Sequence, residues 1–313
     1  MIQRKIYLLL LFSLLSVGLL LSACDQVVIG PAGSTAGPTS SLTTFQVLQN
    51  SVNAMKQLKS SHISLQSNLQ GSNTATATPS AATPSSSIAV TPTAMPGNVS
   101  LSIMGTGDQA LPDQEQLNLT INQGIKVAEI VQGDKVYVQN AQGQWYVLNK
   151  GDFTGLTTNP FAGVNFDQNT LLGLIQHAQI VDHADENLNG QSLRHITANL
   201  DKEGLRQLLL ANPQLQRLFG QQNIDALLNN AKSFLASIDV WIDETQFYIH
   251  RMQLKLNLVA STDGLDGNPP SNVSVSLATT VDQSNFNTPV TITPPANAIP
   301  TNNPGSIIGL GNP

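Results

Sequence analysis

The sequence predicts one α+β domain, built on a long antiparallel sheet with helices gathered on one face. Three observations predict it. Apolar and polar residues alternate over many short segments, the pattern of strands that bury one face and expose the other. Turn residues such as Gly and Asn separate neighbouring segments, as they do in hairpins and meanders. A few other segments repeat their apolar residues at helical spacing.

The expected strands begin at His62 and recur almost to the end of the chain. Residues 62–70 form the first strand, and residues 99–149 form a meander with turns near Gly124, Gly133 and Gly143. Residues 180–200 form a hairpin that turns at Asn189-Gly190, a dipeptide typical of two-residue turns. Two long strands follow over residues 251–258 and 273–281, where Leu and Val alternate with polar side chains.

Four segments show helical periodicity. The first runs from Phe45 to Leu58, with Thr43 or Thr44 available as the N-cap. Thr170–His177 is a short helix, and Leu205–Leu209 belongs to another. A further helix is predicted over Ile224–Ile238, because its apolar residues recur at intervals of three and four: Ile224, Leu227, Leu228, Ala231, Leu235 and Ile238.

Three stretches lack the apolar residues that a folded core needs. Residues 24–41 are rich in Gly, Pro, Ser and Thr and read as a flexible tether. Residues 71–98 are made largely of Thr, Ala, Pro and Ser; because strands flank them, they are interpreted as an overgrown hairpin loop. Residues 296–313 form a loose C-terminal tail, which leaves residues 42–295 as the domain.

The N-terminus has the layout of a secretory signal. Arg4 and Lys5 precede an apolar run over residues 6–21, and small residues follow. The run ends at Leu21-Ser22-Ala23-Cys24, which resembles the lipobox of bacterial lipoproteins. That resemblance implies cleavage after residue 23 and acylation of Cys24. A membrane-spanning anchor is the alternative interpretation of the apolar run.

Composition excludes several classes of partner. Cleavage removes Arg4 and Lys5, so the 14 basic residues fall to 12 against 20 acidic ones, a formal net charge of −8. This balance argues against nucleic acid and against a basic membrane-docking patch, both of which need clustered Lys and Arg. Cys24 is the single cysteine, so the mature domain has no disulfide and no thiolate metal cluster. No cofactor is expected.

Signatures of enzymes are missing. Gly105–Ala110 superficially fits a dinucleotide fingerprint, but a strand follows it where that motif needs a helix, so a hairpin loop is the better interpretation. His177 and His183 lie near acidic residues, but strand alternation points Asp182 away from His183, and no metal site is predicted. His62, His195 and His250 lie singly on strands without a visible partner. Asp239 and Asp243, at strand spacing, are interpreted as solvent-facing rather than as a glycosidase pair.

The order of the elements resembles the LppX/LprG-type lipoproteins of mycobacteria and, more distantly, the LolA-like superfamily. The resemblance runs from about Phe45 to Pro295. These segments carry it together: Leu58–Ile63, Gly133–Val138, Trp145, Asn159–Phe161, Asp239–Asp243 and Phe286–Ile292. It implies a curled antiparallel half-barrel with helices packed on its concave face, around a cavity that holds acyl chains. The insertion at residues 71–98 departs from the compact members of the family.

The resemblance implies a non-enzymatic lipoprotein that binds a lipid, glycolipid or other apolar ligand and transfers it within the cell envelope. It would sit on the outer face of the cytoplasmic membrane, or on the outer membrane of a cell with two. The candidate cavity-lining residues are Leu117, Leu119, Ile121, Val136, Val138, Met252, Leu254, Leu256, Val273, Val275 and Leu277. Two alternatives remain: a surface scaffold or sensor lipoprotein with a filled core, and an envelope hydrolase.

Overall fold

Most of the described part of the chain is a single sheet. The computed structural model describes residues 41–75, 98–122, 124–149, 174, 176–211, 223–261 and 271–302, all within the unit Gly37–Pro313. The described strands are β1 (Ser60–Ala75), β2 (Asn98–Ala110), β3 (Gln114–Ile121), β4 (Ile125–Gln132), β5 (Lys135–Gln139), β6 (Trp145–Asn149), β7 (Ala178–Asp182), β8 (Glu186–Leu188), β9 (Gln191–Leu200), β10 (Ala231–Ile242), β11 (Ile249–Ser261), β12 (Ser271–Ser284) and β13 (Ile299–Pro300).

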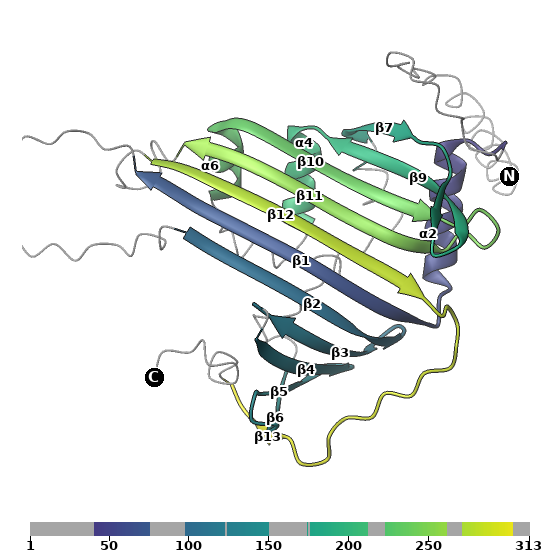
Figure 1. Cartoon of the computed structure of the whole chain (residues 1–313), viewed down its shortest axis with the longest axis vertical. Coiled ribbons are helices and arrows are strands. Elements are labelled where there is room, and N and C mark those ends of the chain that lie inside the picture. The colour runs from purple at the N-terminus through teal and green to yellow at the C-terminus, as the bar shows by residue number, and fades with distance from the viewer. Residues whose placement is uncertain are drawn as a thin grey trace, which may run out of the picture. The chain divides into compact units, whose positions relative to one another are not determined.

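The strands form a sheet in the order β13-β6-β5-β4-β3-β2-β1-β12-β11-β10-β9-β7, and β8 pairs with β9. Strands β1–β6 follow one another as a meander, and β9–β12 do the same. The two series meet in the middle, where β1 pairs antiparallel with β12 from His62 to Ala75. The sheet is large, open and curled, which is consistent with a half-barrel; in Figure 1, β3–β6 turn out of the plane of the longer strands.

Two glycines of β2 explain how neighbouring strands come so close where the sheet curls. A Cβ on Gly107 would lie 1.8 Å from the Gln116 carbonyl oxygen of β3, and one on Gly105 would lie 2.5 Å from Cδ2 of Leu119. The prediction of a hairpin loop over Gly105–Ala110 is therefore wrong, because both glycines lie inside a strand and the turn comes after Ala110. Glycine inside a strand often marks such a close approach.

Three helices are described. Helix α2 (Thr44–Lys56) begins at Thr43, whose side chain forms a capping box with Gln46. Helix α4 (Lys202–Ala211) confirms the predicted Leu205–Leu209 segment. Of the predicted Thr170–His177 helix, only residues 174 and 176 are described as helical, and the remainder lies outside the described residues or, at His177, in a turn.

The predicted Ile224–Ile238 helix is wrong in its second half. Helix α6 (Asn223–Asn229) ends after two turns, and β10 begins at Ala231. Strand β10 lies between β9 and β11, so nearly its whole length pairs on one side or both. Alternation places Ala236, Ile238 and Val240 in the core, and this pairing outweighs the helical spacing of the same residues.

The low-complexity stretch joins neighbouring strands, because β1 and β2 pair antiparallel out to Ser72 and Asn98. Strand β1 continues to Ala75, four residues beyond the start of the predicted insertion, and residues 76–97 lie outside the described part. The tail expected after residue 295 is in part ordered: Ile299 and Pro300 pair in parallel with β6. The predicted signal peptide, Cys24 and nearly all of the tether lie outside the described residues.

Candidate functional site: the apolar face of the sheet

One face of the sheet is apolar across nearly all its strands. Residues directly opposite each other on paired strands share a face. Across the middle of the sheet, Leu256 is opposite Leu277, Leu277 is opposite Leu69, and Leu69 is opposite Leu101. Strand alternation and the same pairings extend this face through β3, β4 and β5. We call it the apolar face.

All eleven candidate cavity-lining residues lie on the apolar face. Eight of them are buried: Leu117, Leu119, Ile121, Val136, Val138, Leu254, Leu256 and Leu277. Met252, Val273 and Val275 are half-buried. Strand alternation thus placed these side chains on a common face.

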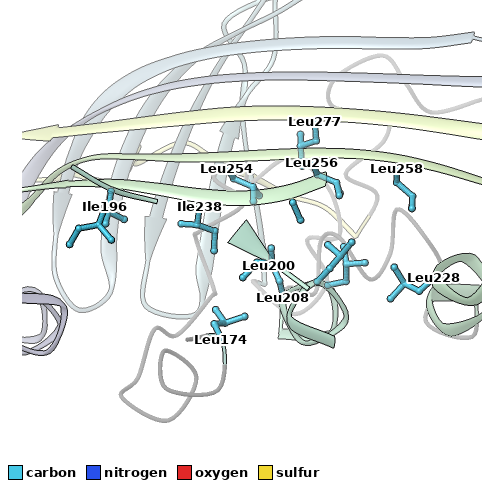
Figure 2. Close-up of a cluster of buried hydrophobic side chains, with 14 of the residues drawn as sticks. Leu174, Ile196, Leu200, Leu208, Leu228, Ile238, Leu254, Leu256, Leu258 and Leu277 are labelled. Atoms are coloured by element: carbon cyan, nitrogen blue, oxygen red, sulfur yellow. The ribbon is translucent and has the colours of Figure 1, made fainter. Parts of the chain in front are cut away.

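Residues of the described helices pack with one part of this face. The helix-covered cluster consists of buried residues of β9–β12 that pack with Val47 of α2, Leu205, Leu208 and Leu209 of α4, and Ile224 and Leu228 of α6. In Figure 2, Leu208 and Leu228 lie on the same side of the sheet as Leu254, Leu256 and Leu258. Amphipathic helices on one face of an antiparallel sheet form the core of an α+β domain.

Another part of the apolar face has a different make-up. Its strand-only cluster comprises Ile103, Leu117, Leu119, Ile121, Val127, Val131, Val136, Val138 and Leu148, all from β2–β6. Within the described ranges, no residue of α2, α4 or α6 belongs to this cluster. The apolar face therefore extends several strands beyond its described helices.

Few polar groups interrupt this face. Ser67 of β1 and Thr279 of β12 are both buried, and their hydroxyls hydrogen-bond each other at 2.8 Å. Glu129 of β4 is only 2% exposed and lies opposite Leu117 and Val138 in the strand-only cluster. Such a face can hold apolar chains, and its polar groups could select or orient a ligand.

A buried arginine lies at one end of the apolar face. Arg194 of β9 is 2% exposed and opposite Ile242. Its guanidinium donates to Asp182, to Glu244 at 2.7 Å and to the Leu42 carbonyl at 2.9 Å. The arginine thus ties β7 and the β10–β11 turn to the segment that leads into α2, and removing it would leave two carboxylates without their cation.

The opposite, outer face carries a cluster that sequence reasoning missed. His195 of β9 stacks between His183 and Trp241, with ring centroids 4.3 and 4.2 Å apart. Glu186 accepts from the Trp241 indole N–H at 2.8 Å, and its other oxygen lies 2.8 Å from Nδ1 of His195. Asp239 lies 3.2 Å from Nε2 of His195 and accepts from the Thr197 hydroxyl.

Electrostatics in this outer cluster favour a charged imidazole between two carboxylates. Burial opposes the charge on His195, but Asp239 and Glu186 outweigh it and raise the pKa of His195. The Trp241 hydrogen bond lowers the pKa of Glu186. Burial works to raise the pKa of Asp239, yet its bonds to His195 and Thr197 leave that pKa lowered.

The solvent-facing interpretation of Asp239 and Asp243 is wrong. Asp239 is 5% exposed because β9 and β11 flank it, and Asp243 is 8% exposed in the turn after β10. Alternation around Trp241 puts Asp239 and the indole on one face, but it cannot identify β9 as their neighbour. In the part of the chain that the structure describes, no group of three or more metal-ligand side chains converges, and no helix is long and apolar enough to span a membrane.

No protein-family model and no curated protein matches the chain. The solved structure of lipoprotein LppX from Mycobacterium tuberculosis is 16% identical with a TM-score of 0.43, and the match covers 79% of this chain and 97% of that one. LprF from Mycobacterium bovis is 15% identical with a TM-score of 0.40, covering 80% and 96%. A putative outer membrane lipoprotein-sorting protein domain from Vibrio parahaemolyticus is 10% identical with a TM-score of 0.23, covering 79% and 93%. These solved lipoprotein structures are what the chain is similar to.

Proposed function

We propose that the chain is an extracytoplasmic lipoprotein, anchored through lipid on Cys24, that binds a lipid or other apolar ligand against the apolar face. The strand-only cluster is the observation that carries the proposal, because it continues the apolar face over β2–β6 beyond the described helices. The sequence supports the anchor, since the apolar run over residues 6–21 ends at the lipobox-like Leu21–Cys24.

In this proposal the helices pack in the concave side of the half-barrel and leave room beside them for an acyl chain. Each methylene moved from water to the apolar face would contribute about 0.8 kcal/mol. A chain inserted over only part of its length would therefore bind usefully. Anchoring outside the membrane would keep the domain within reach of its ligand, and transfer within the cell envelope would follow from reversible binding.

A filled core is the competing proposal, in which the protein is a surface scaffold or sensor lipoprotein. The burial of the strand-only cluster favours it, because Val136 and Val138 are 0% and 1% exposed. Side chains of the protein itself would then occupy the place that the first proposal gives to a ligand.

Native mass spectrometry with one substitution separates the two proposals. The chain from Asp25 onward, made in the cytoplasm, is expected to carry adducts with phospholipid masses. Val138→Trp places a large side chain in the strand-only cluster. If a ligand occupies that space, the variant should lose adducts with little change in melting temperature. In a filled core the same change overpacks the interior and costs about 1–3 kcal/mol.

The matched control is Tyr137→Trp, on the next residue of β5, which points to the opposite face and is half-buried. It should keep the adducts of the parent chain. A parent chain with no adduct, and no binding of a fluorescent fatty-acid analogue at micromolar concentration, would reject the ligand proposal.

A further inference from the structure

The connection between β7 and β8 is held on both faces of the sheet. Both strands pair with β9, β7 along its C-terminal half and β8 along its N-terminal end. We call the connecting residues 182–186 the strap. Asp182, at its start, bonds Arg194 on the apolar face, while His183 and Glu186 reach His195 and Trp241 on the outer face.

The apolar-face anchor of the strap also holds the start of α2. Asp182 accepts from the Thr44 hydroxyl at 2.7 Å, and Arg194 donates to the carbonyl of Leu42. Helix α2 follows directly and buries Val47 in the helix-covered cluster. These hydrogen bonds therefore connect the strap to the N-terminal end of α2, which packs on the apolar face.

One ionisable ring strengthens the outer-face anchor, in addition to the hydrogen bonds from the His183 N–H to the His195 carbonyl oxygen and from Trp241 to Glu186. His195 lies between the carboxylates of Glu186 on β8 and Asp239 on β10, so its positive charge draws the strap toward β10. Other charged or titratable groups face the same cluster: His183 on the strap, and Lys255, Arg251 and Asp282 on β11 and β12. Lys255 contacts Asp239 at 3.6 Å, and Arg251 lies over Trp241 while it pairs with Asp282.

We propose that the strap is a pH-dependent latch for α2. When His195 is charged, the outer anchor closes and Asp182 is held where it fixes the start of α2. When His195 loses its proton, Glu186 loses its ion pair and keeps its hydrogen bond to Trp241, so the strap loosens and α2 is seated less firmly on the apolar face. The inference rests on the proposed function in one respect, since α2 covers part of the face where we propose that lipid binds.

The sign of the pH dependence follows from the three groups. The pKa of His195 is raised by folding. Its contribution to the stability of the latch is therefore complete below pH 6.5, the ordinary pKa, and is lost as pH rises through the pKa of the folded state. The pKa values of Glu186 and Asp239 are lowered, so their contributions persist until pH falls below their ordinary values of 4.5 and 3.8. The latch should therefore be firmest between pH 4.5 and 6.5 and loosen on the alkaline side.

Hydrogen exchange of the mature-length chain tests the latch without any ligand. Amide protection of α2 and of residues 182–188, corrected for intrinsic exchange, should be severalfold lower at pH 8.5 than at pH 6, while β1 and β12 stay unchanged. His195→Gln should remove this pH dependence. The matched control is His62→Gln, an outer-face histidine on β1 bonded to Asp108 and Thr106, which should preserve it.

A second readout covers the case in which His195→Gln fails to fold. The chain has two tryptophans, so Trp145→Phe leaves Trp241, stacked on His195, as the sole indole emitter. Its emission should titrate with a midpoint above 6.5, the ordinary pKa of histidine. Equal protection of α2 at both pH values, or flat Trp241 emission, overturns the latch. Lipid adducts with flat exchange would reject the latch alone, whereas pH-dependent exchange without adducts would reject only the proposed function.

Discussion

Gly107→Ala should strongly destabilise the domain, because the added carbon meets backbone. The new Cβ would lie 1.8 Å from the Gln116 carbonyl oxygen, whereas an ordinary contact begins at 3.4 Å. Strands β2 and β3 would have to separate by about 1.6 Å there, which takes ladder hydrogen bonds out of range. Overpacking costs about 1–3 kcal/mol and each lost bond about 0.5–1.5 kcal/mol.

A smaller effect acts in the opposite direction. Alanine reduces the conformational entropy of the unfolded chain, which stabilises the folded domain by about 0.4–1 kcal/mol. With one or two ladder hydrogen bonds lost, the net expectation is a loss of about 1–5 kcal/mol in the free energy of unfolding. Urea unfolding of the mature-length chain, followed by tryptophan fluorescence, measures it as a fall in the midpoint. For a domain of this size the melting temperature should fall by about 2–4 °C for each kcal/mol.

Two other glycines calibrate the result. Gly124→Ala is the control, because the nearest atom to its Cβ is the Asn122 carbonyl oxygen at 3.9 Å. Gly105→Ala should fall between the two, since it meets only the movable end of the Leu119 side chain. A Gly107→Ala variant within 1 kcal/mol of the Gly124→Ala variant would refute the proposed close approach of β2 and β3.

Three further changes test other parts of the molecule. Arg194→Met should lower the free energy of unfolding in urea by about 3–5 kcal/mol, because it leaves Asp182 and Glu244 without their shared cation. A loss under about 1 kcal/mol would contradict the stabilising role of the buried Arg194 ion pairs. Replacing residues 76–97 by a short turn should leave the melting temperature unchanged within a few degrees, since loop closure changes by only about 0.6 kcal/mol per doubling of length; a collapse would show that the segment packs on the domain. Cys24→Ser should abolish acylation and leave uncleaved or released protein, and a mature-length variant that still partitions into membranes would reject the anchor.

Local pattern was enough to predict which side chains share a face. Leu117 and Leu119, or Leu254 and Leu256, lie two residues apart, so strand geometry alone puts each pair on one side of the sheet. The burial of the same pairs then follows from the preference for covering apolar surface. The Asn189-Gly190 turn was equally local, because both residues take positive φ angles.

The segment after α6 shows where local pattern stops being informative. Residues 231–238 place Ala231, Leu235 and Ile238 at helical spacing, while Phe234, Ala236 and Ile238 fit strand alternation equally well. The choice is made mainly by β11, which pairs with β10 from Ala231 onward, while β9 pairs with it only from Ser237. The helical interpretation places Leu235 on the buried side, whereas in the strand it lies on the outer face and is 51% exposed.

Polar contacts required still more distant information. His195 meets Asp239 across 44 residues, and Arg194 meets the Leu42 carbonyl across 152. Such pairs depend on register, and a slip of one residue would move every side chain of a strand to the other face. The register of β9 against β10 places Arg194 on the apolar face and His195 on the outer face, one residue apart. The sequence contains both side chains, but only the paired sheet turns them into two anchors of one strap.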